Sequence, residues 1–405
     1  TGTVGIDFAA VRAHVRGAIA QIAPVDSIEA LEAEGVTVRL GTATFTDPCT
    51  VELDGKRLPF HQAIVATGAS PAVPPIPGLA SASYLTSDTV WDLENLPEDL
   101  VVLGGGSIGC ELGQAFARLG ASVTLVEGAP RLIPREDAQA SRTVDAALRE
   151  DGIRVLTGQG VARVEAGPGS KGRLTLEDGT MVPFGRLLVA VGRTPRTREL
   201  GLQSAGVEVD QRGFVAVNER LRTTNPRIWA AGDLTGHPQF THTAGVHGSL
   251  AASNAVLGLR RSVDTAIVPR VTFTHPEVAA VGVPTSPLPE GLHLVELTHG
   301  HVDRAVTEGD TAGFTRLALD RAGRVLGATV VGPRAGESLG ELTLAIKQGL
   351  RARDLAATIH PYPTYNDGAW NAAIDDLRTA LATGRMARGI AVLAGVRRWR
   401  LRWAR

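Results

Sequence analysis

A run of closely spaced glycines, Gly104-Gly105-Gly106-Ser107-Ile108-Gly109, has the residue types and spacing of a dinucleotide-binding loop. In such a loop Gly104 allows the tight turn, Gly106 lets the backbone approach a pyrophosphate, and Gly109 lets the helix pack closely on the strand. Phosphates would lie at the start of the helix, where backbone N–H groups and the helix dipole favour negative charge. Glu127 stands where a carboxylate accepts hydrogen bonds from a ribose 2′-hydroxyl.

The elements around this loop follow the order that the motif needs. An apolar strand at 101–103 leads into the glycines, a helix-forming segment follows, and a second apolar strand at 122–126 ends directly before the acid. This order, with an acid at its end, separates a dinucleotide site from a glycine-rich turn that binds nothing. The sequence therefore predicts a βαβ nucleotide-binding unit.

Three further apolar strands end in small residues: Ala66-Thr67-Gly68, Ala190-Val191-Gly192 and Ala230-Ala231-Gly232-Asp233. The carboxyl ends of parallel strands are where open α/β sheets bind ligands, and small side chains there let a cofactor approach the backbone. Asp233 suits a hydrogen bond to a ribose or ribitol hydroxyl. Each strand end taken alone fits an ordinary buried strand better than a ligand site.

The composition is that of a globular protein of two or three domains, with 405 residues, 43% of them hydrophobic and 20% charged. A net charge of −1 argues against a nucleic-acid partner, and no apolar run reaches the roughly 18 residues of a membrane span. The only cysteines, Cys49 and Cys110, exclude a disulfide scaffold and favour the cytoplasm. Cys110 is predicted to be a small buried packing residue.

Seven stretches of the chain together resemble the flavin-dependent pyridine nucleotide–disulfide oxidoreductases, and most of all their mercuric-reductase-like branch. They are IVATGASPAVPPIPG (64–78), VVLGGGSIGCELG (101–113), VEGAPRLIPRED (126–137), VAVGRTPRT (189–197), TTNPRIWAAGDLTGHPQF (223–240), FTHPEVAAVG (273–282) and HPYPTYND (360–367). The resemblance covers nearly the whole chain. It implies an α/β fold with two Rossmann-like domains, one for FAD and one for NAD, followed by an α+β dimerisation domain.

The resemblance also implies domain bounds and cofactor sites. The FAD domain would comprise residues 1–95 and 191–263, be incomplete at its N-terminus, and enclose the NAD(P) domain at 96–190; the dimerisation domain would span 264–378, before a basic tail at 379–405. FAD would bind at Ala66, Thr67, Gly68 and Asp233. The nicotinamide dinucleotide would bind at Gly104, Gly105, Gly106, Ser107, Ile108, Gly109, Cys110, Glu111, Glu127 and Gly192. Glu111 would lie near the nicotinamide and would be a catalytic residue together with Tyr362 and Asp367.

The choice between the two nicotinamide dinucleotides depends on charge. Glu127 favours NAD because its carboxylate would repel a 2′-phosphate, while Arg131 and Arg135 leave NADP possible. The hydride would pass from this nucleotide to the flavin, and its electrons would move on to a small-molecule acceptor that the sequence does not name.

The chain departs from the family pattern at two places. The family opens with its own FAD-binding G-x-G-x-x-G unit and a redox-active C-x-x-x-x-C, and residues 1–405 contain neither, so we expect them not to carry out disulfide chemistry. The family's H-x-H-P-T-x-x-E motif reads HPYPTYND here, which puts Tyr362 at the catalytic His position and Asp367 at the Glu position. A free Tyr titrates near pH 10, so Tyr362 would be a poor proton shuttle that could still contact a flavin or a metal. His360 would be structural or would support a neighbouring site residue.

We therefore expect an FAD-dependent NAD(P)H oxidoreductase that forms a homodimer with a shared active site. Two alternatives remain: a cysteine-independent flavin reductase or transhydrogenase, and a non-catalytic, NAD-binding dimeric remnant. His237, His242 and His247 lack the spacing of a metal site and are interpreted as loop and helix residues beside the flavin. The basic tail either covers the dimer as a solvated helix or lies on an anionic membrane surface.

Overall fold

The computed structural model describes residues 5–402, and the chain divides into two compact units. Unit 1 comprises the chain up to Pro130 together with residues 151–265, and unit 2 comprises residues 131–150 together with the chain from Ala266 onward. Unit 1 is built on parallel strands, whereas unit 2 is built on one antiparallel sheet. Among residues 5–402, no helix combines the length and apolar character needed to cross a membrane.

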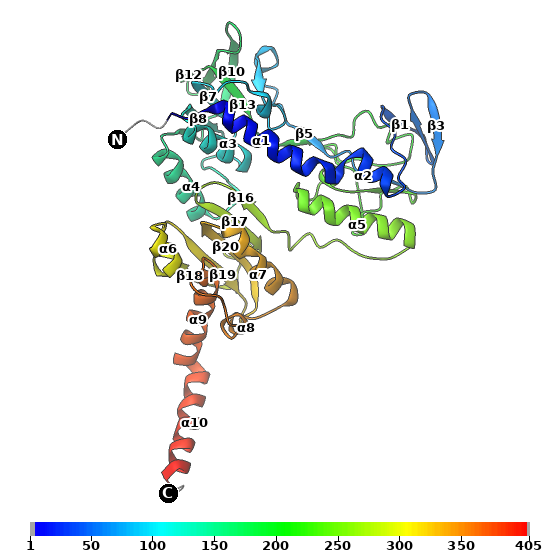
Figure 1. Ribbon diagram of the computed structural model, residues 1–405. Helices are drawn as coiled ribbons and strands as arrows, with labels where there is room; N and C mark the ends of the chain where they lie inside the picture. The colour runs from blue at the N-terminus through cyan, green and yellow to red at the C-terminus, as the bar shows by residue number, and fades with distance from the viewer. Residues whose placement is uncertain (1–4, 403–405) are drawn as a thin grey trace. The chain divides into compact units, whose positions relative to one another are not determined.

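The main sheet of unit 1 has five parallel strands in the order β6-β13-β7-β8-β9 (Figure 1). These are β6 (Tyr84–Leu85), β13 (Arg186–Val189), β7 (Asp99–Leu103), β8 (Ser122–Glu127) and β9 (Arg154–Thr157). Helix α3 (Ser107–Arg118) connects β7 to β8. Leu100, Val102 and Leu125 are fully buried, as expected for parallel strands covered on both faces. This is the predicted βαβ unit.

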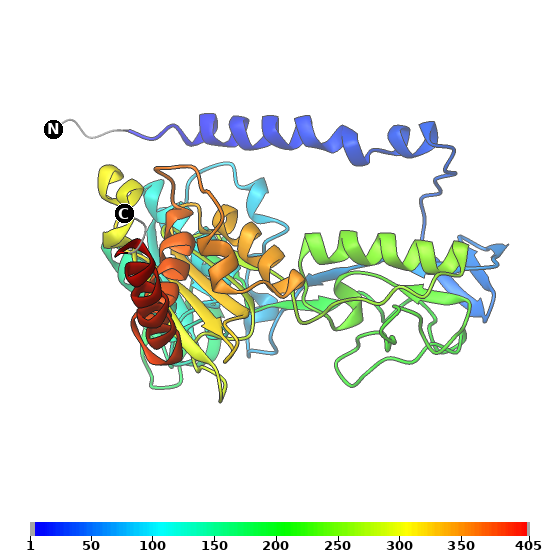
Figure 2. The same cartoon turned by 90° about the horizontal axis from the view of Figure 1, so that it is seen from below.

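Smaller sheets complete unit 1. Its other strands are β1 (Ala43–Asp47), β2 (Thr50–Leu53), β3 (Lys56–Pro59), β4 (Ala63–Val65), β5 (Ala69–Pro71), β10 (Val161–Ala166), β11 (Gly172–Leu176), β12 (Met181–Phe184), β14 (Arg193–Pro195) and β15 (Ile228–Ala230). The pairs β4–β15 and β5–β14 each form a two-stranded sheet, and α5 (Thr241–Leu257) runs beside β4 and β15 (Figure 2). Asp54-Gly55, a residue pair that favours hairpin turns, joins β2 to β3.

The start of the chain differs in part from its predicted pattern. In residues 7–33 the apolar side chains Phe8, Val11, Val15, Ile19 and Ile22 have helical spacing, which predicts a helix. The segment forms two helices, α1 (Phe8–Ile22) and α2 (Ile28–Ala33), because Pro24 lacks the N–H that a continuous helix needs. Residues 36–40 (Val36-Thr37-Val38-Arg39-Leu40) have a strand-like composition, and a strand predicted from it is wrong, since these residues have no strand pairing among the described residues.

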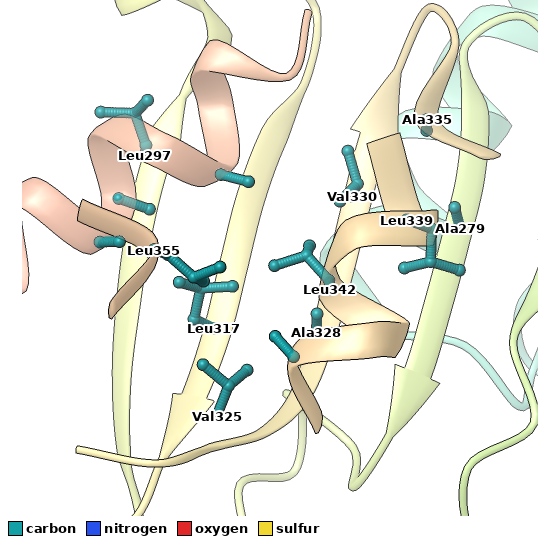
Figure 3. Packing of buried hydrophobic residues seen from close by; sticks show 14 of the residues in the cluster. Ala279, Leu297, Leu317, Val325, Ala328, Val330, Ala335, Leu339, Leu342 and Leu355 are labelled. Carbon is teal, nitrogen blue, oxygen red and sulfur yellow. The ribbon is translucent and has the colours of Figure 1, made fainter. Parts of the chain in front are cut away.

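Unit 2 is a five-stranded antiparallel sheet with helices packed against it. Its strands, in spatial order, are β16 (Arg270–Thr272), β17 (Glu277–Gly282), β20 (Val325–Gly332), β19 (Phe314–Leu319) and β18 (His293–Thr298). Its helices are α4 (Ala138–Glu150), α6 (Asp303–Glu308), α7 (Ala335–Gln348), α8 (Ala352–Ala356), α9 (Asp367–Ala382) and α10 (Gly384–Arg402). Figure 3 shows Leu339 and Leu342 of α7 packing on sheet residues such as Val330.

A buried carboxylate ties α4 to the sheet of unit 2. Asp137 accepts hydrogen bonds from the N–H of Gln139 at 2.7 Å, from the Arg316 guanidinium at 2.7 Å and from the Thr285 hydroxyl at 3.0 Å. Only 1% of the Asp137 side chain is exposed, so its charge depends on these donors.

Candidate cofactor-binding site

The glycine loop has the close contacts that the motif requires. A Cβ on Gly104 would lie 2.5 Å from the Ala190 carbonyl oxygen, and one on Gly109 would lie 1.9 Å from the carbonyl oxygen of Gly104. Both positions therefore exclude a side chain. A Cβ on Gly106 would meet no atom of the described residues within 4 Å, although Gly106 is the N-cap of α3. The space beside Gly106, at the start of a helix, is thus open to a phosphate.

Glu127 is fixed against this loop by the register of two strands. Leu103 and Val126 are paired across β7 and β8, so the residue after β7 and the last residue of β8 are neighbours. The carboxylate of Glu127 accepts the N–H of Gly105 and the N–H of Ala129, each at 2.6 Å. A carboxylate has about four lone-pair positions, and these two bonds leave the others for a ribose hydroxyl.

The remaining residues predicted for the nucleotide follow α3 and β13. Cys110 is fully buried, with its thiol 3.4 Å from the Gly105 carbonyl oxygen, as the packing interpretation predicted. Glu111 is partly buried in the first turns of α3. Gly192 follows β13 with a φ of +134°, a conformation that suits glycine.

A second group of predicted residues meets at the ends of β4 and β15. These strands are parallel, with Val65 opposite Ala230, so Ala66-Thr67-Gly68 and Ala231-Gly232-Asp233 leave the same edge of the sheet. The hydroxyl of Thr67 donates to the Arg196 carbonyl oxygen at 2.7 Å. The register thus brings Thr67, Gly68 and Asp233 to one end of the sheet, as expected for a ligand site at strand ends.

Asp233 has a charged neighbour that the motif reading missed. The Nε of Arg193 lies 3.3 Å from its carboxylate, and the same guanidinium donates to the Ala69 carbonyl oxygen at 2.7 Å. Arg193 begins β14, and the pairing of β14 with β5 carries it to the strand end. Arg193 thus forms an ion pair with Asp233 while it is bonded to the backbone next to Gly68.

Two histidines meet beside Asp233, which their spacing in the sequence did not reveal. The rings of His237 and His247 lie edge to face with centroids 5.1 Å apart, and Nδ1 of His247 accepts the Gly232 N–H at 3.3 Å. Burial lowers the pKa of His247 to about 4 and also lowers that of His237. Nδ1 of His237, Nε2 of His247 and the Thr243 hydroxyl are buried with no hydrogen-bond partner among residues 5–402. Such unpartnered groups are expected where a polar ligand completes the site.

Two of the predicted catalytic residues, Tyr362 and Asp367, lie in unit 2, and each is hydrogen-bonded to another residue. The hydroxyl of Tyr362 donates to Asp303 of α6 at 2.5 Å, and 67% of the Tyr362 surface is exposed. This hydrogen bond raises the pKa of Tyr362 above its ordinary value of 10.0. Asp367 instead accepts the Thr364 N–H at 3.2 Å, at the start of α9. Asp303, 59 residues away in the sequence, is thus the partner that the motif did not show.

His360 is held by three neighbours in unit 2. Its Nε2 is 2.9 Å from Glu341, its Nδ1 is 3.0 Å from the Thr358 carbonyl oxygen, and its ring stacks on Trp370 with centroids 5.4 Å apart. Within residues 5–402 no cluster of three or more His, Cys, Asp or Glu side chains has the arrangement of a metal site.

Comparison with known proteins agrees with this arrangement. Residues 8–248 match the pyridine nucleotide-disulphide oxidoreductase family, and residues 268–373 match its dimerisation domain. The chain belongs to the pyridine nucleotide-disulphide oxidoreductase family. Enzymes of this family are FAD-dependent NAD(P)H oxidoreductases, so the chain has the cofactors and the reaction class that its sequence predicted.

Individual relatives are similar over most of the chain. A mercuric reductase from Streptomyces lividans is 43% identical over 335 residues, which cover 80% of this chain and 70% of the relative. A mercuric reductase from Staphylococcus aureus is 36% identical, covering 92% and 70%. A dihydrolipoyl dehydrogenase from Thermus scotoductus is 36% identical, covering 85% and 76%.

Solved structures show the same fold. LpdA from Mycobacterium tuberculosis superposes with a TM-score of 0.84 at 29% identity, covering 92% of this chain and 84% of that one. A Cu(II) complex of the HOCl-induced flavoprotein disulfide reductase RclA from Escherichia coli gives 0.76 at 28% identity, covering 82% and 77%. The predicted fold class, with FAD and NAD domains followed by a dimerisation domain, is confirmed.

Both cofactors fit the residues of this oxidoreductase. The open space at Gly106 and the fixed Glu127 carboxylate suit a nicotinamide dinucleotide. The buried, unpartnered atoms around His247 and the acceptor Asp233 suit the polar groups of FAD. The residues that contact each cofactor stay predictions.

Proposed function

We propose that this chain oxidises NADH through the site at Gly104–Gly109 and passes electrons by way of FAD to a small-molecule acceptor. When bound, FAD supplies the hydride-accepting and electron-passing chemistry that protein side chains lack. The chain's own residues bind and orient the two cofactors. The glycine loop receives the pyrophosphate, and Glu127 receives the ribose and disfavours a 2′-phosphate. The fixed carboxylate of Glu127 is the observation that supports this choice of NADH most directly.

The ends of β4 and β15 are the proposed flavin site. Ala66, Thr67 and Gly68 give a backbone surface without bulky side chains, and Asp233 accepts a hydroxyl hydrogen bond while Arg193 holds its orientation. In this proposal, residues 1–95 and 191–263 form the FAD domain, 96–190 the NAD(P) domain and 264–378 the dimerisation domain. The proposed place of action is the cytoplasm.

We further propose a homodimer in which Tyr362 contributes to a shared active site. The Tyr362 phenol stays protonated at neutral pH because Asp303 accepts its hydrogen and raises its pKa. With that hydrogen committed to Asp303, the phenol oxygen offers lone pairs to a bound acceptor and is a poor proton donor. Tyr362 therefore holds the acceptor, and the proton comes from another source.

The relatives named mercuric reductases suggest a metal ion as the acceptor. The two cysteines of residues 1–405 do not form a pair that could hold one. Cys49 is exposed in the turn between β1 and β2, where its N–H donates to Asp47, and Cys110 is buried in α3. The proposal for these residues therefore covers the NADH-to-flavin half of the reaction and leaves the acceptor's chemical identity open.

The substitution Glu127→Gln tests the choice of nucleotide. Glutamine keeps one acceptor oxygen but turns an amide N–H₂ toward one of the two backbone N–H groups, so it loses a charge-assisted bond worth roughly 1.5–3 kcal/mol. We expect the NADH Kd to rise and the NADPH Kd to rise less, which narrows the preference for NADH. An unchanged ratio of the two Kd values, measured by quenching of nucleotide fluorescence, would refute the proposed role of Glu127.

A further inference from the structure

The last helix, α10 (Gly384–Arg402), has no part in the proposed function. It continues from α9 and projects away from the sheet of unit 2 (Figure 1), and the match to the dimerisation domain ends before it, at residue 373. Between residues 387 and 400 no residue is buried. Most residues of this part of the helix are exposed to their surroundings.

The charge of the tail is opposite to that of the rest of the chain. Residues 379–405 contain seven arginines and no Asp or Glu. Of the 41 basic and 42 acidic side chains in the whole sequence, 34 basic and 42 acidic ones precede this segment. The net charge of −1 for the whole sequence is thus the sum of a cationic tail at 379–405 and an anionic remainder of the chain. An exposed segment of this kind is attracted to an anionic surface.

Four apolar side chains form a stripe on α10, the apolar stripe: Val392, Leu393, Val396 and Trp399. Val392, Val396 and Trp399 are spaced by four and three residues, which places them on one face of a helix. The exposed fractions in the stripe run from 45% at Val396 to 70% at Leu393. By the same spacing Arg398 lies away from the stripe, whereas Arg388 and Arg400 lie in line with it, four residues before Val392 and four after Val396. A long arginine at an end of the stripe can extend its charge away from an apolar layer.

We propose that α10 binds the surface of an anionic lipid bilayer. The headgroups would pair with the arginines, and the apolar stripe would enter the boundary between headgroups and acyl chains. A nucleic acid would satisfy the arginines but not the exposed Val392, Leu393 and Val396, so the stripe favours lipid. The helix lies along the bilayer in this arrangement, since it lacks the apolar length to cross it. The inference does not depend on the acceptor or on the choice of nucleotide.

The full-length holoenzyme can be tested by sedimentation with vesicles of phosphatidylcholine alone and of phosphatidylcholine with phosphatidylglycerol. We expect binding to the anionic vesicles only. Each basic residue near such a surface contributes about 1 kcal/mol, a factor of roughly five, so Arg397→Gln with Arg398→Gln lowers the binding constant roughly 25-fold. The matched control, Arg260→Gln with Arg321→Gln, removes the same charge from exposed positions outside the tail and should leave binding unchanged.

A second variant keeps the charge and removes the apolar stripe. The combination Val392→Ser, Val396→Ser and Trp399→Ser should weaken vesicle binding by at least about tenfold, because it removes the apolar area that enters the bilayer. The proposal is overturned if the protein ignores anionic vesicles, if the stripe variant binds them as well as wild type, or if the control weakens binding equally. It is also overturned if the stripe variant changes the oligomeric state seen by light scattering, because the stripe would then be an interface between copies. Duplex DNA that competes fully with the vesicles for wild type and stripe variant alike would identify a nucleic-acid site instead.

Discussion

Two glycines in the nucleotide loop should respond oppositely to the same substitution. Gly106→Ala places a methyl group where no atom of residues 5–402 lies within 4 Å, at a φ of −74° that alanine adopts readily. Gly109→Ala places a methyl group 1.9 Å from the Gly104 carbonyl oxygen. The first change should therefore spare the fold and the second should damage it. The pair separates the space reserved for a ligand from the space filled by the protein.

The two substitutions should change different quantities: Gly109→Ala the free energy of unfolding, and Gly106→Ala the NADH Kd. At a compatible conformation, Gly→Ala stabilises by roughly 0.4–1 kcal/mol because it restricts the unfolded chain, so Gly106→Ala should be at least as stable as wild type. Overpacking of a filled site costs about 1–3 kcal/mol, which is the loss expected for Gly109→Ala in the free energy of unfolding. The same range, applied to a methyl group in the path of the pyrophosphate, predicts an NADH Kd raised roughly 5- to 150-fold in Gly106→Ala.

Urea unfolding and NADH titration of both variants test this reasoning. Gly340→Ala in α7 is a matched control, because a Cβ there also meets no described atom within 4 Å and no nucleotide is expected nearby. Its free energy of unfolding should equal or exceed that of wild type, and its NADH Kd should stay unchanged. If Gly106→Ala binds NADH normally, or unfolds as easily as Gly109→Ala, the space beside Gly106 is not reserved for a pyrophosphate.

Three other changes probe unit 2. Tyr362→Phe removes the hydroxyl that is bonded to Asp303, so turnover with an acceptor should fall roughly fivefold, the effect of one lost hydrogen bond. The rate of flavin reduction by NADH, measured by stopped flow, should stay unchanged. An equal loss in both steps would contradict the role given to Tyr362. Asp137→Ala removes one of the two carboxylates that pair with the buried Arg316, which keeps Glu296 at 2.7 Å. The free energy of unfolding should fall by about 1–3 kcal/mol in urea titration, and no measurable loss would show that water replaces the carboxylate. Burial lowers the pKa of His299 to about 4 in the folded chain, against about 6.5 in the unfolded chain. Below pH 6.5 the unfolded chain therefore gains a proton that the folded chain does not, and by pH 4 this lowers the free energy of unfolding by about 3 kcal/mol. His299→Asn should therefore lose less stability than wild type between pH 7 and pH 4, and parallel curves would refute this assignment.

The loop and its acid were predictable because the motif is local. Strand, turn and helix follow one another in the sequence, and the pairing of β7 with β8 brings Glu127 to Gly105 without any distant contact. The ends of β4 and β15 were predictable for a similar reason, since parallel strands leave the same edge of a sheet.

Contacts made by tertiary packing were not predictable. Tyr362 reaches Asp303 across 59 residues, and no spacing rule connects a loop before α9 with the start of α6. His237 and His247 meet because a loop folds back on α5, although their ten-residue separation matches no helical face. A possible signal for the second pair was a histidine, His247, in an otherwise small and apolar stretch of a helix.

Anaerobic titration of the flavin-loaded protein with NADH tests the central claim most directly. We predict that NADH bleaches the absorbance band of the oxidised flavin in wild type, and that Gly106→Ala requires much higher NADH for the same bleaching. A protein that binds NADH while its flavin stays oxidised, or that binds NADH and holds no flavin when FAD is supplied, would contradict the account.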